Sequence, residues 1–374
     1  MSSLYRSAIS ARLAKLPAEL PPYVEEEDGE GDSLGDLPPG GGMGPPAMQV
    51  HLAGLNPAYA PISAESYFAD AAEVSVPGRE LNFRIYYTPP KFADGAVMVC
   101  HHGAGYSGLS FALFAREVTD MTKGECGVLA IDARRHGKTT SSSDDNDLSI
   151  EALVQDFVEL MCTVFPDPKA APTLLLIGHS MGGSVVVRAS SRLLERKYNL
   201  VGVAILDIVE GSALEALPHM NSLLNARPEG FDSVEEAIEW HLKTKTIQNV
   251  ESARVSIPAA VCEAPEGSRG PKYIWRTPLR STAPYWQDWF TGLSSSFLAV
   301  RSARLLVLAG TDRLDKPLMI GQMQGKFQME VIPGVGHMLQ EDDPRRFAEI
   351  MVAFLRRNER VIVGNTRLLA VGAS

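Results

Sequence analysis

The chain has 374 residues, of which 45% are hydrophobic and 21% are charged, and its formal net charge is −10. This length is enough for one large α/β domain with insertions or for two small domains. The acidic balance argues against nucleic acid as a partner, because a nucleic-acid-binding surface needs a basic patch.

The sequence contains no recognisable membrane or secretory signal. No apolar run approaches the roughly 18 residues that a membrane-spanning helix needs, and the N-terminus lacks the apolar core of a secretory signal. We therefore expect no membrane partner and an intracellular location, in the cytoplasm, the nucleus or both.

Residues 1–48 differ in composition from the rest of the chain. They include the stretches PPYVEEEDGEGDS and LPPGGGMGPP, which are rich in proline, glycine and acidic residues. Such a segment buries too little apolar surface to offset the entropy that is lost on ordering. We expect it to be disordered or loosely docked, ahead of a folded domain over residues 49–358.

Short apolar runs follow from residue 81 onward, each ended by a turn or a polar cluster. Residues 81–87 alternate apolar and polar side chains, as a half-buried strand does. The later runs are continuously apolar, which is typical of parallel strands covered on both faces. They comprise residues 96–100, 128–131, 174–177, 201–206, 305–308 and 329–332. Helical patterns at 149–165 and 182–197 separate some of these runs, which predicts an α/β fold with a doubly wound, mostly parallel sheet.

A long insertion interrupts this alternation. About 90 residues separate two of the predicted strands, which is too many for a simple crossover connection. We interpret residues 211–300, with helical stretches at 214–224 and 234–245, as a helical cap or lid over the carboxyl edge of the sheet. A final amphipathic helix is predicted over 344–358, and residues 359–374 form a C-terminal tail.

The strongest functional motif is G-x-S-x-G, which reads Gly178-His179-Ser180-Met181-Gly182 here. An apolar strand precedes it and a helical pattern follows it, which is the context of the nucleophile elbow of α/β hydrolases. Small neighbours let the strained turn approach other backbone closely, and the turn exposes the serine at a helix N-terminus. The motif indicates a serine hydrolase whose nucleophile is Ser180.

A serine nucleophile needs a base to accept its proton and an acid to orient that base. In this fold the order along the chain is serine, acid, histidine. The histidines after Ser180 are His219, His241 and His337. His337 lies between the last predicted strand and the final helix, so we expect it to be the base. His219 and His241 lie on helical patterns of the insertion and are expected to be surface or packing residues.

Two aspartates are the main candidates for the acid. Asp207 follows the strand after the elbow unit, and Asp312 follows the strand that precedes the His337 strand. Many hydrolases of this fold use the second position, so topology alone narrowly favours Asp312. Asp315 is a weaker candidate of the same kind. A loop aspartate that is not the acid is expected to cap a turn or a helix.

An oxyanion hole needs two backbone N–H donors. One is expected from Met181, the residue after the nucleophile, and the other from Ala104 in the loop His101-His102-Gly103-Ala104-Gly105. Adjacent histidines on a strand point to opposite faces. We therefore interpret the histidine pair as shaping the loop and expect no metal site.

A further loop, which begins at Asp132 and includes Arg134 and His136, follows another predicted strand. Loops of this D-x-R-x-H-G type are common in the fold, where they brace the floor of the active site. We expect these three residues to have a structural role.

From residue 66 to about residue 355 the chain resembles the protein phosphatase methylesterases. The segments that carry the resemblance are SYF (66–68), GHSMGGS (178–184), LDIVEGSALEAL (206–217), YWQDWFTGLSSSFL (285–298) and AGTDRLDKPLMIGQMQGKFQMEVIPGVGH (309–337). One departure lies in the oxyanion loop, where this family commonly has HGGGHS and this chain has HHGAGYS. Ala104 and Tyr106 there replace a glycine and a histidine.

The resemblance implies an esterase that removes the C-terminal leucine methyl ester from the catalytic subunit of 2A-type serine/threonine phosphatases, which would be its partner. It also implies a triad of Ser180, Asp207 and His337, because the acid in this family is the aspartate of the D-[IV]-VEG segment. On this basis Asp207 replaces Asp312 as the expected acid. The reaction would pass through an acyl-enzyme and need no metal or organic cofactor.

The aromatic segment with Tyr285, Trp286 and Trp289 is expected either to bind the substrate tail or to pack the cap against the core. Two other functions stay open at this point. One is a carboxylesterase or lipase for small esters, and the other is a hydrolase-fold protein that binds a phosphatase without catalysis.

Overall fold

The computed structural model describes residues 56–143, 146–310 and 314–359. The chain divides into two units, Met1–Asn56 and Pro57–Ser374, and every helix and strand below belongs to the second unit. The segment 1–48 and the tail beyond Glu359 lie outside the described residues, so the predictions for them are not tested.

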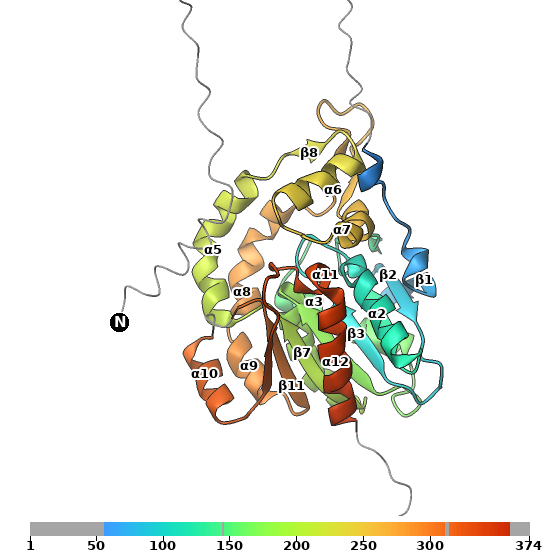
Figure 1. Ribbon diagram of the computed structural model, residues 1–374, viewed down its shortest axis with the longest axis vertical. Helices are drawn as coiled ribbons and strands as arrows, with labels where there is room; N and C mark the ends of the chain where they lie inside the picture. Colours follow the sequence, from blue (N-terminus) through green and yellow to red (C-terminus); the bar gives the residue numbers. More distant parts are fainter. Residues whose placement is uncertain (1–55, 144–145, 311–313, 360–374) are drawn as a thin grey trace, which may run out of the picture. The chain divides into compact units, whose positions relative to one another are not determined.

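A nine-stranded mixed sheet forms the centre of the second unit, with the strand order β1-β2-β4-β3-β6-β7-β11-β12 and β5 paired to β2 (Figure 1). The six strands from β4 to β12 in this order are parallel, and β2 pairs antiparallel with β1, β4 and β5. The strands are β1 Asp70–Val76, β2 Leu81–Thr88, β3 Val97–His101, β4 Gly127–Ile131, β5 Thr140–Ser141, β6 Leu174–His179, β7 Leu200–Leu206, β11 Ala303–Leu308 and β12 Gln328–Val331.

The predicted strands are confirmed, each within two residues of its observed ends. Strands β3, β4, β6 and β7 carry almost exclusively buried side chains because helices cover both faces of the sheet. The elements that were not predicted include β1 and the helix α2 (Ala112–Thr122). The side chains of β1 are mostly exposed, so the strand has no apolar run that would mark it in the sequence.

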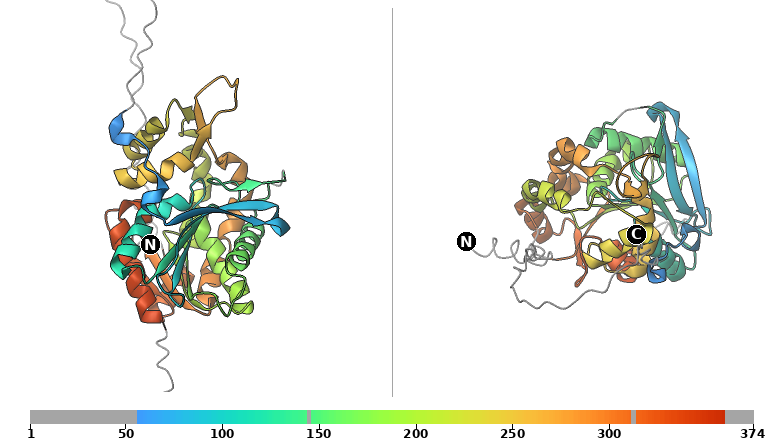
Figure 2. Two further views of the ribbon diagram at one scale, coloured as in Figure 1. Left: turned by 90° about the vertical axis from the view of Figure 1, so that its right-hand side faces the viewer. Right: turned by 90° about the horizontal axis from the view of Figure 1, so that it is seen from above.

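The helices lie in two layers, one on each face of the sheet, as the edge-on view in Figure 2 shows. One layer contains α2 and α12 (Pro344–Asn358), which meet where the rings of Phe114 and Phe347 lie 4.6 Å apart. The other contains α3 (Ile150–Val164) and α4 (Met181–Glu195). A separate cluster of buried apolar residues lies under each layer, so the sheet has two hydrophobic cores.

The segment between β7 and β11, called the cap below, contains helices and a small antiparallel sheet. The helices are α5 Glu210–Asn225, α6 Val234–Lys243, α7 Val250–Ser256, α8 Trp286–Phe290 and α9 Leu293–Ala299. The sheet, which was not predicted, pairs β8 (Gly230–Phe231), β10 (Tyr273–Trp275) and β9 (Val261–Glu263) in that order. Its strands have two or three residues each, too few for a periodic sequence pattern.

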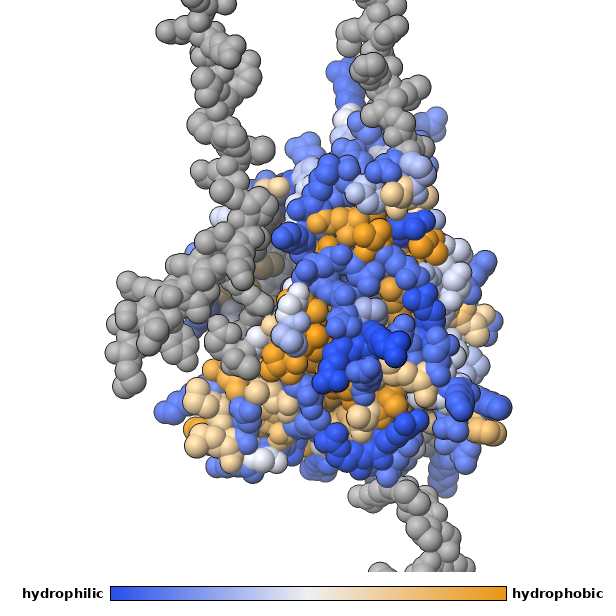
Figure 3. All heavy atoms as spheres, in the orientation of Figure 1, coloured by the Kyte–Doolittle hydropathy of each residue, from blue (hydrophilic) through white to orange (hydrophobic). Residues whose placement is uncertain are grey.

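Helix α10 (Lys316–Met323) follows β11 and exposes several large apolar side chains. Met319, Ile320 and Met323 are exposed, Met323 by 84% of its surface. Apolar colours gather in this region at the lower left of Figure 3. Clustered exposed apolar groups often mark contacts with other molecules. Helix α11 (Leu339–Asp342) completes the described helices, none of which is long and apolar enough to cross a membrane.

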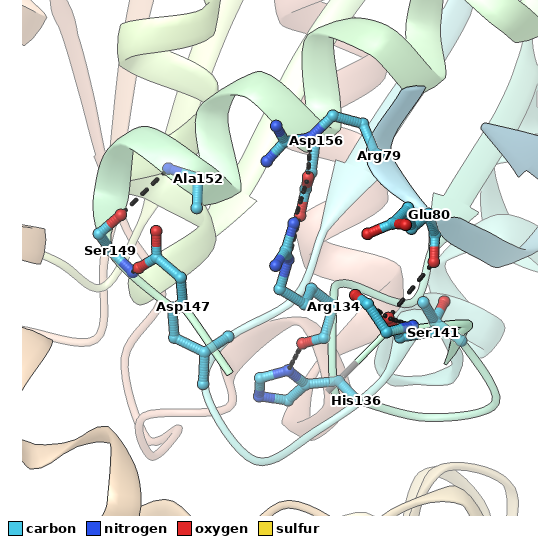
Figure 4. Close-up of polar contacts among 12 residues, drawn as sticks. Arg79, Glu80, Arg134, His136, Ser141, Asp147, Ser149, Ala152 and Asp156 are labelled. Carbon is cyan, nitrogen blue, oxygen red and sulfur yellow. Dashed lines mark hydrogen bonds and ion pairs between the residues drawn. The ribbon is translucent and has the colours of Figure 1, made fainter. Parts of the chain in front are cut away.

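A buried ion network braces the loop after β4 (Figure 4). The Asp156 carboxylate of α3 accepts from Arg134 Nε at 2.7 Å and from Arg79 Nε at 2.6 Å, and Figure 4 shows it between the two guanidinium groups. The side chains of Asp156 and Arg134 are each only 3% exposed. At the start of the loop, Asp132 accepts the N–H groups of Gly108 and Lys138 at 2.7 and 2.8 Å.

We predict that Asp156→Asn lowers the free energy of unfolding by about 3–5 kcal/mol, because the buried guanidinium of Arg134 and the partly buried one of Arg79 then lose the negative charge between them. Urea unfolding at neutral pH measures the change. Glu151→Gln is the matched control, since its ion pair with Arg192 leaves Glu151 70% exposed, and its expected cost is below about 1 kcal/mol. Equal effects of the two substitutions would contradict the prediction.

Candidate active site

Ser180 occupies a strained turn between β6 and α4. Its φ of 51° and ψ of −119° lie in a region that non-glycine residues rarely adopt. The turn is fixed at both sides, because the Ser180 N–H donates to Leu206 O at 3.1 Å and its carbonyl accepts from Gly183 at 2.9 Å. A Cβ at Gly182 would lie 2.4 Å from His101 O, so only glycine fits beside the serine.

The hydroxyl of Ser180 is available for chemistry. Ser180 is the N-cap residue of α4, yet its side chain makes no capping hydrogen bond, and it has no other hydrogen-bond partner among the described residues. The backbone amides of Met181 and Ala104 likewise have no acceptor within the described part of the chain. Met181 is the first residue of α4, where helix geometry leaves N–H groups without an intrahelical partner.

The loop after β3 lies directly against Ser180. A Cβ at Gly103 would be 3.2 Å from Ser180 Cβ and 2.7 Å from His179 Nδ1, so the loop approaches as closely as a glycine allows. His102 Nε2 accepts the Ala133 N–H at 2.9 Å, and its Nδ1 therefore donates to Gly103 O at 2.7 Å. Both ring nitrogens of His102 thus hold the loop that contains Ala104.

Asp207 and His337 meet at the carboxyl edge of the sheet. His337 Nδ1 lies 2.8 Å from Asp207 Oδ2, and the second carboxylate oxygen, Oδ1, accepts the Ala309 N–H at 3.0 Å. Asp207 is fully buried, whereas the side chain of His337 is 49% exposed. The arrangement leaves Nε2, the other ring nitrogen of His337, toward the accessible side.

The environment of Asp207 favours its charged form. Burial alone raises the pKa of Asp207, but the hydrogen bond and charge of His337 and the N–H of Ala309 outweigh it, so the pKa lies below its ordinary value of 3.8. By contrast, burial lowers the pKa of His101 to about 4 and that of His179 to about 3, which keeps both imidazoles neutral at physiological pH.

Two contacts, one to His337 and one to the residue before it, were not predicted from the sequence. His179 Nε2 lies 2.9 Å from the carbonyl oxygen of His337, and the two rings lie 4.6 Å apart. Asp342 accepts the N–H of Gly336 at 2.7 Å and that of Gln248, in the cap, also at 2.7 Å. In the sequence, the first contact was indicated only by the position of His179 directly before Ser180 in the G-x-S-x-G motif.

The remaining predicted residues have different positions. Asp312 lies outside the described residues. Asp315 is the N-cap of α10, where Oδ1 accepts the Leu318 N–H at 3.0 Å, as expected for an aspartate that is not the acid. His241 is buried in the cap and His219 is exposed on α5.

The aromatic segment of the cap packs inward. Trp286 and Trp289 are buried, and their indole N–H groups donate to Thr282 Oγ1 and to Leu148 O, each at 2.7 Å. Tyr285 is half-buried against the same apolar cluster. These contacts account for the segment by packing, and its part in substrate binding stays a prediction.

Comparison with known proteins identifies the family. The model of the alpha/beta hydrolase family matches residues 98–350. A relative from Cryptococcus neoformans var. neoformans serotype D, named protein phosphatase methylesterase 1, is 44% identical over all of this chain and 96% of its own length. A relative of the same name from Aspergillus fumigatus is 39% identical over 96% of this chain and 90% of its own length. Another from Schizosaccharomyces pombe is 38% identical over 80% of this chain and 86% of its own length. The chain belongs to the protein phosphatase methylesterase 1 family.

Solved structures agree on the fold. E-2-(acetamidomethylene)succinate hydrolase superposes with a TM-score of 0.61 at 16% identity, over 77% of this chain and 99% of its own. A marine microorganism esterase superposes with a TM-score of 0.53 at 20% identity, over 74% of this chain and 99% of its own. The predicted α/β-hydrolase fold, the family and the esterase class are therefore confirmed.

Because the pKa of Asp207 is lowered in the folded protein, this residue makes the free energy of unfolding depend on pH. A carboxyl group of this kind stabilises the folded state above its unfolded pKa of about 3.9, and the contribution disappears as the pH falls through the lower folded pKa. We predict that Asp207→Asn lowers the free energy of unfolding at pH 7 and that the difference from wild type shrinks below about pH 5. Urea unfolding at a series of pH values measures it. A difference that is constant down to pH 2 is the contradicting result.

Proposed function

We propose that the chain is a serine carboxylesterase that hydrolyses the C-terminal leucine methyl ester of the catalytic subunit of 2A-type serine/threonine phosphatases. The observation that carries the proposal is the hydrogen bond between Asp207 and His337, at the sheet edge where the Ser180 elbow lies. Family membership supports this choice of substrate, and the geometry of the site supports the chemistry.

In the proposed mechanism, Ser180 attacks the ester carbonyl while His337 Nε2 accepts its proton. Asp207 holds the Nδ1–H tautomer of His337 and stabilises the imidazolium that forms. The hydroxyl of Ser180 moves within hydrogen-bond distance of His337 when the ester binds, as is common for such pairs. The amides of Met181 and Ala104 stabilise the oxyanion.

The reaction releases methanol first and the phosphatase second. Methanol leaves with the proton from His337, and an ester then links Ser180 to the phosphatase tail. A water molecule that gives a proton to His337 attacks this ester, and His337 passes that proton to Ser180 Oγ as the free carboxylate leaves. The side chains of this site are sufficient for both steps, without a metal or an organic cofactor. A phosphatase substrate also fits the predicted location in the cytoplasm or nucleus.

The direct test is methanol release from a methylated phosphatase catalytic subunit. We expect the wild-type enzyme to release methanol and Ser180→Ala to lower kcat by at least about 10⁴-fold, as loss of a triad serine does in other hydrolases. Retention of activity by Ser180→Ala would overturn the mechanism. Thermal unfolding of the variant controls for its fold.

The same assay separates the alternatives. Asp207→Asn is expected to lower activity far more than Asp312→Asn, because Asp207 is hydrogen-bonded to His337. Rapid hydrolysis of short acyl esters with no action on the methylated phosphatase would favour a small-ester carboxylesterase or lipase. Binding of the phosphatase with no methanol release would favour a non-catalytic binding protein.

A further inference from the structure

Arg227 lies in the cap, just after α5, and its guanidinium stacks on tryptophan. Its central carbon lies 3.8 Å from the ring centroid of Trp275 and 6.0 Å from that of Trp240. The residue is half-buried. Stacking of this kind is attractive, and it leaves the N–H groups free to donate at the edge of the guanidinium plane.

Within the described part of the chain, this cation has no carboxylate partner. Among the described residues, no hydrogen bond or ion pair joins Arg227 to another group, whereas Arg276 and Arg280 of the cap donate to backbone carbonyls. Burial lowers the pKa of Arg227, and only Tyr106 acts in the opposite direction. An arginine stays protonated even so, and a partly buried charge without a counter-charge is unfavourable.

An aromatic cluster connects Arg227 to the proposed oxyanion loop. The ring of Tyr106, two residues beyond Ala104, lies 6.3 Å from that of His241. His241 in turn lies 4.9 Å from Trp240 and 5.5 Å from Trp275. Arg227 therefore belongs to the part of the cap that packs on this loop.

The other titratable groups around this cluster are neutral or already bonded. Burial lowers the pKa of His241 to about 3, so it carries no charge. Glu341 is buried, which raises its pKa well above the ordinary value, and it accepts from Ser256 Oγ at 2.5 Å. Asp342 accepts the N–H groups of Gly336 and Gln248. None of these acids neutralises Arg227.

We propose that Arg227 binds a carboxylate side chain of the substrate polypeptide, a few residues before the methyl ester, and thereby makes the enzyme selective for an acidic tail. One guanidinium matches the charge and planar shape of one carboxylate, whereas phosphate groups are commonly held by several cations. This inference rests on the function proposed above and adds a specificity-determining residue to it.

The test uses short peptides that end in leucine methyl ester and carry one aspartate at successive positions before it, each paired with its asparagine counterpart. The readout is the ratio of kcat/KM between the two members of a pair. In wild type we expect a ratio of about 10 to 100 at the best position, the size of a charged hydrogen bond. In Arg227→Gln the ratio falls to about 1, and Arg227→Lys gives an intermediate value. A ratio within one variant does not depend on how much of that variant is folded.

Arg269→Gln is the matched control, because it removes an exposed cation from the cap, and it keeps the wild-type ratio. A wild-type ratio near 1 at every position, or an unchanged ratio in Arg227→Gln, overturns the inference and leaves the proposed function intact. Methanol release from the phosphatase but from none of the peptides also overturns it. Hydrolysis of small esters without action on phosphatase or peptides contradicts the proposed function itself.

Discussion

The hydrogen bond between Asp207 and His337 is the interaction on which the proposed site depends, because it joins the end of β7 to the loop after β12, 130 residues apart in the chain. Asp207 has a φ of 46°, which turns its side chain out of the strand direction. Its N–H donates to Val307 O and its carboxylate accepts the Ala309 N–H, so β11 and the residue after it hold both the backbone and the side chain of Asp207. The His337 imidazole is thereby fixed on the side of the sheet edge where Ser180 emerges from β6.

The segments that carry the family resemblance meet around two other acidic residues. Glu210, three residues after Asp207, accepts the N–H groups of Gly292 and Ser294 at 2.8 and 2.9 Å. Asp315 accepts the Gly211 N–H at 3.2 Å and the Ser294 hydroxyl at 2.5 Å. These hydrogen bonds thus connect the start of α5, the start of α9 and the start of α10.

The sequence predicted the parts of the fold and site that depend on local pattern. Buried parallel strands appear as apolar runs, and the elbow appears as small residues around Ser180. The choice between Asp207 and Asp312 could not be made from topology, because β7 and β11 are neighbours and end at the same edge. Local pattern also carries no information on which carbonyl His179 contacts, or on whether Trp289 faces substrate or core, since both depend on packing between distant segments.

Reaction with a fluorophosphonate, followed by mass spectrometry of proteolytic peptides, tests the central claim that Asp207 and His337 activate Ser180. A fluorophosphonate modifies serine hydroxyls that a neighbouring base activates, and it does so without any phosphatase tail. The account predicts one label per chain, located on Ser180, with loss of esterase activity in proportion and much slower labelling of Asp207→Asn. Labelling of a different residue, or loss of activity without modification of Ser180, would contradict it.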